Sequence, residues 1–120
     1  MTETIAYKIL TAEQFAALEA DAFEGAPIDR ADGYIHLSSA SQVTETVARH
    51  FAGQTALLIA AIDLGALGDA VRWEPSRHGE LFPHLYGRLA WAAVLAHGRV
   101  EWGPDGVVRL PGAGLYISVF

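Results

Sequence analysis

The chain has 120 residues, of which 52% are hydrophobic and 18% are charged. This composition predicts one domain, residues 1–120, with a sizeable apolar core, and it excludes wholesale disorder. The formal net charge of −6 disfavours a binder of long nucleic acids, and the absence of cysteine excludes disulfides and thiol catalysis.

The acidity is concentrated at the start of the chain. Residues 1–33 hold seven acids and two bases, whereas the remaining 87 residues hold seven acids and six arginines. A single nucleotide-sized anion therefore remains a compatible ligand for the later part of the chain. The first residues lack a signal-peptide pattern, and no apolar run approaches the roughly 18 residues that span a bilayer. We expect a cytoplasmic protein without a membrane partner.

The first third of the chain predicts a strand, a helix and a loop. Residues 5–10 are short and apolar, as in a strand, and Thr11 with Gln14 forms a capping-box pattern at the start of a helix. The segment from Gly25 to Gly33 contains proline, two aspartates and two glycines, so it predicts an exposed loop.

The middle of the chain predicts a second strand, a second helix and a buried strand. Residues 34–38 alternate so that Tyr34, His36 and Ser38 share the face opposite the aliphatic residues. A Ser39–Gln42 capping box then predicts a helix of about three turns. Residues 56–62 are uniformly apolar, which is typical of a central strand buried on both faces.

The last part of the chain differs in composition from the parts before it. Residues 73–87 combine prolines, glycines, histidines and aromatic residues and predict an irregular segment, with a strand starting at His84. Residues 91–97, 100–102 and 107–110 predict closing strands, the last two joined by a turn at 103–106. Strands combined with two helices in the first half predict an α+β fold.

Three polar groups are candidates for one cleft: Tyr34/His36/Ser38, Trp73-Glu74 and His84/Tyr86. They contain side chains that act as acids, bases or anchors. The alternative is that His36 and His84 are hydrogen-bonded structural histidines, as we expect for His50 and His97.

Glu74 also has two interpretations. Beside Trp73 it could stabilise a developing positive charge, or it could form a surface ion pair with Arg72 or Arg77. Arg72, Arg77 and Arg88 could grip a diphosphate or carboxylate, or they could be ordinary surface residues.

A metal site built from His36, Glu74, His78 and His84 is a further hypothesis. It is a weak one, because Pro75 and Gly79 disfavour the helix that would place Glu74 and His78 on one face. The chain has no glycine-rich phosphate loop and no nucleophile elbow.

Several of these segments together resemble one family. YKILT at residues 7–11, DGYIHLSS at 32–39 followed by Gln42, Trp73-Glu74, and FPHLYG at 82–87 are similar to the bacterial domain-of-unknown-function family 952 (DUF952). The resemblance covers residues 5 to about 110. It implies an ADP-ribosyltransferase-like fold, in which a split two-sheet core holds NAD in a central cleft.

The resemblance also implies roles for particular residues. Such proteins use a His or Arg on the first strand, a Tyr or Ser on a second strand, and a late Glu that stabilises an oxocarbenium-like ribose. By chain order these positions fall on Lys8, on His36 or Ser38, and on Glu74. Lys8 departs from the pattern, because an ammonium group has neither the acceptor of an imidazole nor the planar fork of a guanidinium.

The leading hypothesis is an enzyme that handles a nucleotide, ribose or phosphate ligand, as a transferase or glycohydrolase acting on NAD or a related nucleotide. We assign catalytic roles to His36, Glu74 and His84 and ligand binding to Lys8, Ser38, Arg72 and Tyr86, with no metal. No cofactor is assigned, and NAD would enter as a substrate. The rival hypothesis is a non-catalytic ligand-binding or interaction domain that has lost the catalytic residues. The sequence does not give the oligomeric state.

Overall fold

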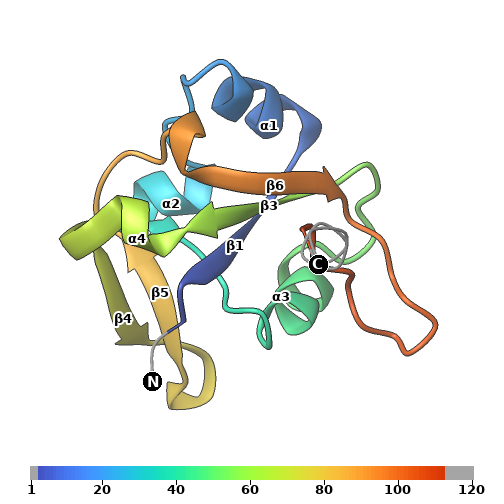
Figure 1. Ribbon diagram of the computed structural model, residues 1–120. Coiled ribbons are helices and arrows are strands. Elements are labelled where there is room, and N and C mark those ends of the chain that lie inside the picture. Colours follow the sequence, from blue (N-terminus) through green and yellow to red (C-terminus); the bar gives the residue numbers. More distant parts are fainter. Residues whose placement is uncertain (1–2, 113–120) are drawn as a thin grey trace, which may run out of the picture.

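The computed structural model describes residues 3–112, with only the backbone of Arg77. Its helices and strands alternate along the chain (Figure 1). In chain order they are β1 (Ile5–Leu10), α1 (Ala12–Glu19), α2 (Pro27–Asp32), β2 (Ile35–His36), α3 (Val43–His50), β3 (Leu58–Asp63), α4 (Leu64–Leu67), η1 (Gly68–Ala70), β4 (Val71–Pro75), η2 (Arg77–Gly79), β5 (Leu81–Leu85), η3 (Trp91–Ala93) and β6 (Val94–Arg99).

Two three-stranded antiparallel sheets form the framework, which confirms the α+β class. The first sheet has the order β1-β3-β6 and the second has the order β2-β5-β4. They meet where Tyr7 in β1 pairs with Ser38, just after β2. The amide of Tyr7 donates to the Ser38 carbonyl at 2.7 Å, and the amide of Ser38 donates back at 2.9 Å.

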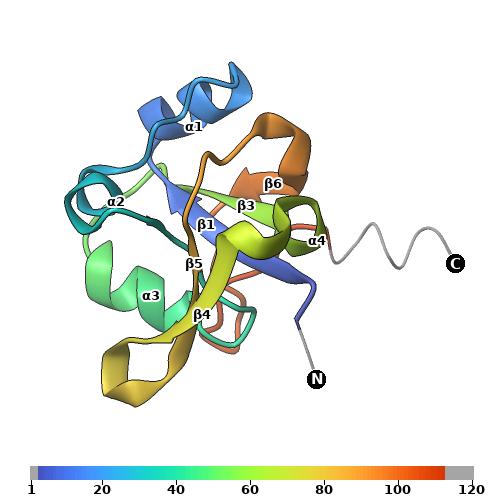
Figure 2. The same cartoon turned by 90° about the vertical axis from the view of Figure 1, so that its left-hand side faces the viewer.

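The central strand β3 of the first sheet is buried on both faces, as the apolar run at 56–62 predicts. One face of β3 carries Ala60 and Ile62 and packs into the core that reaches the second sheet. The other face carries Ile59 and Ala61 and packs under α3. In both views α1, α2 and α3 follow one another from top to bottom, and the β4–β5 hairpin turn lies at the bottom (Figures 1 and 2).

The first strand and helix match the expectation. Thr11 Oγ1 accepts a hydrogen bond from the Gln14 amide, and Gln14 Oε1 accepts one from the Thr11 amide, so the capping box is complete. The predicted box at Ser39 is half formed, because Gln42 Oε1 accepts the Ser39 amide while the Ser39 hydroxyl contacts Ser41. The helix that follows is shorter than the predicted three turns and ends at His50.

The prediction of an exposed loop from Gly25 to Gly33 is wrong. Pro27 occupies the first turn of α2, where its missing N–H is no loss, and Gly33 ends the helix in the left-handed conformation with φ of 86°. Asp29 is 2% exposed, and its carboxylate accepts the Ala26 amide at 2.8 Å. The loop-forming residue types are here the start and stop signals of a short helix.

The prediction of an irregular segment over residues 73–87 is also wrong, because β4 and β5 form a hairpin. Pro75 ends the edge strand, and Pro83 lies one residue beyond the last β2–β5 pair, His36 with His84. A proline at that point ends the ladder where β2 also ends. At the turn, His78 and Gly79 adopt left-handed φ values of 56° and 76°.

The closing strands are fewer than expected. Residues 91–93 form a 3-10 turn before β6, and of the last two predicted strands only a bridge between Trp102 and Val108 forms. The turn at 103–106 is present, since the Gly103 amide donates to Val107 O at 2.8 Å. Between residues 3 and 112, no helix is long and apolar enough to cross a membrane.

Candidate functional site

A cavity of about 550 Å³ lies where β1 meets β2, which is within the range of small-molecule sites. Both sheets, the starts of α1 and α2, the end of α3 and the hairpin contribute to its wall. Its polar lining residues are Tyr7, Lys8, Thr11, Gln14, Asp32, Tyr34, His36, Ser38, Thr46, His50, Gln54, Ser76 and His84.

The antiparallel registers bring the predicted residues to this cavity. Lys8 shares a face of β1 with Ala6 and Leu10, which pack toward the second sheet. His36 and His84 are direct partners across β2 and β5, and their ring centroids lie 5.6 Å apart. Pairing between strands thus joins histidines that are 48 positions apart in the sequence.

Asp29 holds the Lys8 side of the site together, and sequence reasoning missed it. Its Oδ2 lies 2.9 Å from Lys8 Nζ, and its Oδ1 accepts the backbone amide of His36 at 3.0 Å and contacts His36 Nδ1 at 2.7 Å. Lys8 Nζ also donates to the His36 carbonyl at 3.0 Å. A buried ion pair therefore fixes α2 against β1 and β2.

Burial and pairing act in opposite directions on this ion pair. Burial favours the neutral carboxyl of Asp29, but hydrogen bonds from His36 and the charge of Lys8 outweigh it and lower the pKa of Asp29 to about 2. Burial lowers the pKa of Lys8, and Asp29 opposes that shift. The carboxylate is thus stabilised by donors that converge on it from three segments.

His36 lies between two carboxylates of α2. Its Nδ1 contacts Asp29, and its Nε2 lies 3.0 Å from Asp32 Oδ2. Both contacts are hydrogen bonds only when both ring nitrogens carry protons. The ring is 29% exposed, so it is held at the cavity wall rather than inside the core.

A second carboxylate–histidine pair lies next to the first. His84 Nδ1 is 2.7 Å from Glu74 Oε1, and the Tyr86 hydroxyl donates to the same oxygen at 2.8 Å. The hydrogen bonds from His84 and Tyr86 lower the pKa of Glu74, and Glu74 in turn raises the pKa of Tyr86. The Arg72 guanidinium lies over the Tyr86 ring, 4.7 Å from its centroid.

The pairing with Glu74 sets the chemistry of His84. When Nδ1 donates to the carboxylate of Glu74, Nε2 of the neutral ring is an acceptor. Nε2 has no hydrogen-bond partner among the residues that the structure describes, and the His84 side chain is 4% exposed. His84 therefore lines the cavity, and its buried Nε2 is able to accept a hydrogen bond.

Tyr34 packs against both histidines. Its ring stacks on His84 with centroids 4.1 Å apart and lies 4.7 Å from His36 and 5.2 Å from Tyr86. Burial, together with the negative charges of Asp32 and Glu74, raises the pKa of the Tyr34 phenol. The alternation at 34–38 identifies Tyr34 as a companion of His36, but its contact with His84 requires the tertiary fold.

The seven predicted site residues divide into two groups. Lys8, His36, Ser38 and His84 line the cavity, whereas Glu74, Arg72 and Tyr86 form a layer beside His84 and do not line it. In this structure Glu74 contacts His84 and Tyr86. The Ser38 hydroxyl lies 2.9 Å from that of Thr46.

The other histidines have separate surroundings. His50 lines the cavity from the end of α3, and His97 packs on the rings of Phe15 and Trp91. His78 lies at the hairpin turn, 3.2 Å from Arg49. In the described range, no three His, Asp or Glu side chains are grouped to hold a metal ion, so the set of His36, Glu74, His78 and His84 is not assembled.

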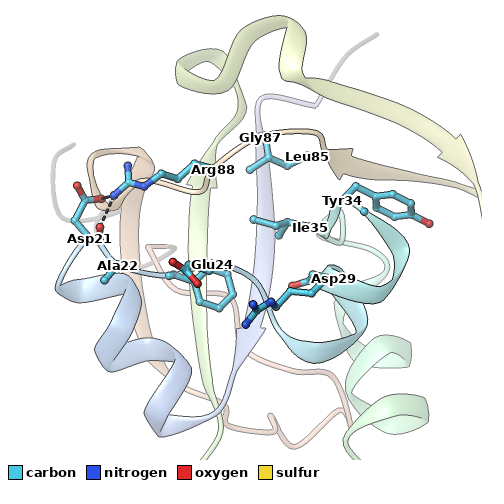
Figure 3. Close-up of a pocket in the computed structure, with 12 residues that line it drawn as sticks. Asp21, Ala22, Glu24, Asp29, Tyr34, Ile35, Leu85, Gly87 and Arg88 are labelled. Atoms are coloured by element: carbon cyan, nitrogen blue, oxygen red, sulfur yellow. Dashed lines mark hydrogen bonds and ion pairs between the residues drawn. The ribbon is translucent and has the colours of Figure 1, made fainter.

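A second cavity of about 490 Å³ lies behind α2, toward the end of β5 (Figure 3). There Arg88 forms an exposed ion pair with Asp21 at 2.7 Å and also donates to its backbone carbonyl. Exposed pairs of this kind contribute little to stability. The Tyr34 ring is directed away from this pair in Figure 3. Four of the seven predicted residues line the first cavity, and none of the seven lines the second.

The comparisons with known proteins agree with the motifs. The sequence model of the family described as "Protein of unknown function (DUF952)" matches residues 9–97. The chain belongs to the DUF952 family. Residues 32–39 and 82–87, which carry the resemblance, both lie within the match and supply His36, Ser38 and His84 to the cavity.

Solved structures of a related protein cover this DUF952 chain almost completely. The crystal structure of protein CC0527 from Caulobacter crescentus is 39% identical and has a TM-score of 0.79, covering 96% of this chain and 99% of that one. Its solution NMR structure gives 40% identity and a TM-score of 0.74 with the same coverage. A search of curated proteins gives no match.

Proposed function

We propose that this DUF952 protein is an enzyme that acts on a small ribose-bearing molecule in the cavity between the two sheets. His84 is its acid–base residue, and Glu74 is the residue that positions it. The 2.7 Å contact between Glu74 and His84 is the observation that carries the proposal. It leaves Nε2 of His84, which lines the cavity, as a buried hydrogen-bond acceptor. A histidine held by a carboxylate through Nδ1 is a recurrent arrangement in general-base catalysis.

An ADP-ribosyltransferase-like relationship would make NAD the substrate. The split into two three-stranded sheets and the cavity at their junction support this relationship. In the reaction, the bond between ribose C1′ and the nicotinamide nitrogen breaks, and nicotinamide leaves with the electron pair. Water or an acceptor hydroxyl adds to C1′, and its proton passes to Nε2 of His84.

The remaining residues have positioning and binding roles in this proposal. Tyr34 offers an aromatic face to a planar ring or a developing cation. Lys8 and Asp29 hold the backbone of His36 in place through direct hydrogen bonds. Glu74 acts on the reaction through His84, so it is a positioning residue and does not contact the sugar.

NMR titration with NAD and ADP-ribose tests the proposal. We expect amide shifts at Tyr34, His36 and His84, release of nicotinamide from NAD, and loss of turnover in His84→Gln. Glu74→Gln, at a 34% exposed side chain, is a second variant that spares the core. His78→Asn is the matched control at the hairpin turn, because asparagine tolerates the left-handed backbone there.

A non-catalytic binding domain is the second candidate, and one observation favours it. Lys8, which the family resemblance assigns to the ligand, is already bound by Asp29 and the His36 carbonyl. Saturable shifts in the cavity without nicotinamide release would support this candidate. Absence of shifts at the cavity with both compounds would contradict both functions.

A further inference from the structure

The charges around the cavity indicate which part of a ligand can enter it. On the basis of the proposed function, we infer that the cavity binds a positively charged group in preference to an uncharged one. Any phosphate of the ligand stays outside the cavity. Three features of the described lining support this: the one lysine is neutralised, the nearby helix N-termini are closed, and the charges that remain are negative.

Lys8 is the only Lys or Arg in the described lining, and its charge is not free. Phosphate sites in proteins rely on free Lys or Arg groups or on unpaired backbone amides. Both carboxylate oxygens of Asp29 lie within 3.2 Å of Lys8 Nζ, which also donates a hydrogen bond to the His36 carbonyl. Lys8 and Asp29 are 5% and 2% exposed, so the charge of Lys8 is neutralised inside the protein by that of Asp29.

The helix ends at the cavity wall are closed by the chain itself. In the first turn of α1, Thr11 and Gln14 satisfy each other's amides in the capping box. At α2 the N-cap residue Ala26 has no side-chain cap, but the Asp29 carboxylate lies in the first turn and accepts the Ala26 amide, so a negative charge already occupies this helix end. An anion at either end would have to compete with oxygen atoms that the chain already supplies.

The charges that remain beside the cavity are negative. Asp32 lines it with a 43% exposed side chain, and Glu74 lies directly behind His84. Protonated forms of His36 and His84 would each be balanced by these same carboxylates. The aromatic lining residues Tyr34 and Phe82 offer ring faces that suit a planar or cationic group. A phosphate would meet the carboxylate of Asp32 and no unpaired Lys or Arg in the described lining.

Three probes that share one ribose and one ring system test the inference. Nicotinamide riboside is a cation, its reduced dihydro form is neutral, and nicotinamide mononucleotide adds a phosphate to the cation. Calorimetry should rank the cation above the neutral form and show no gain in affinity from the phosphate. Inorganic phosphate at millimolar concentration should neither displace the riboside nor shift the amides of Tyr34 and His84.

Asp32→Asn supplies the charge variant. The amide keeps an acceptor near His36 Nε2, whereas the negative charge is removed, so we expect the preference for the cation over the neutral form to fall on the order of fivefold. Asp69→Asn, an exposed change on η1 outside the cavity, is the matched control and should leave the ranking unchanged.

The outcomes separate this inference from the proposed function. A mononucleotide that binds tenfold tighter than the riboside, with shifts at His84, would overturn the inference and leave the proposed function in place. An Asp32→Asn variant whose preference for the cation over the neutral form is as large as that of the wild type would also overturn it. Failure of all nicotinamide compounds, NAD and ADP-ribose to bind would overturn the proposed function and this inference together.

Discussion

Asp29 is the residue on which the order of the site depends. It joins α2, β1 and β2 by accepting from the Ala26 amide, Lys8 and the His36 amide. The sequence places it among loop-forming residues, and no motif includes it, whereas Asp32 opens the DGYIHLSS segment. Its role depends on Lys8, which is 21 positions earlier and becomes a neighbour only in the folded protein.

Removing the charge of Asp29 should destabilise the fold more than a surface substitution would. We expect Asp29→Asn to lower the free energy of unfolding by about 3 kcal/mol, because Lys8 is left buried without its counter-charge. Urea denaturation of Asp29→Asn, Lys8→Met and the double variant measures the coupling. The double variant should lose less stability than the sum of the single variants, and strict additivity would contradict the pairing.

The low pKa of the Asp29 carboxyl group predicts that the stability of the fold depends on pH. The pKa of Asp29 is about 2 in the folded protein, compared with 3.8 for an ordinary aspartate. The unfolded chain therefore takes up the proton first, and this contribution to stability is present above pH 4 and is lost as the pH falls toward 2. The loss should be roughly 2 kcal/mol.

Urea denaturation at pH 4, 3 and 2 measures this acid dependence. Other carboxyl groups also titrate in this range, so the quantity to compare is the stability difference between the wild type and Asp29→Asn. That difference should shrink as the pH falls. A constant difference across the range would show that Asp29 titrates normally.

At the scale of elements, α2 and the β4–β5 hairpin show where sequence patterns mislead. Proline and glycine are read as loop residues, yet Pro27 starts α2, Gly33 ends it and Pro83 ends a strand pairing. The patterns succeeded where one element explains them, as in the Thr11 capping box and the apolar run of β3. They failed where the effect of a proline or glycine depends on its position within a helix or strand.

Gly33→Ala tests the end of α2. Gly33 has a φ of 86° and open space where the added methyl group would lie, so the cost comes from backbone strain and not from a clash. We expect a loss of roughly 1–2 kcal/mol in unfolding free energy. Gly98→Ala is the matched control, since its surroundings are also open and its φ is ordinary. Equal effects of the two substitutions would contradict this account.

At the scale of the whole molecule, the sequence predicted the members of the site better than their arrangement. Periodicity placed Tyr34, His36 and Ser38 on one face, and residue type and sequence neighbours made His84 and Glu74 candidates. Strand pairing then decided that His84 lines the cavity while Glu74 lies beside it. The net charge of −6 likewise does not predict the balance of charges at the cavity, because that balance depends on the pairing of Asp29 with Lys8.

The Tyr7–Ser38 pair has a mechanical consequence. In the described part of the chain it is the backbone pairing that couples the two sheets, and it consists of two hydrogen bonds at 2.7 and 2.9 Å. Lys8 and His36 lie within two residues of it, and both line the cavity between the sheets. Together with the buried cluster that packs between the sheets, this pairing therefore fixes how far apart the two sheets lie at the cavity wall.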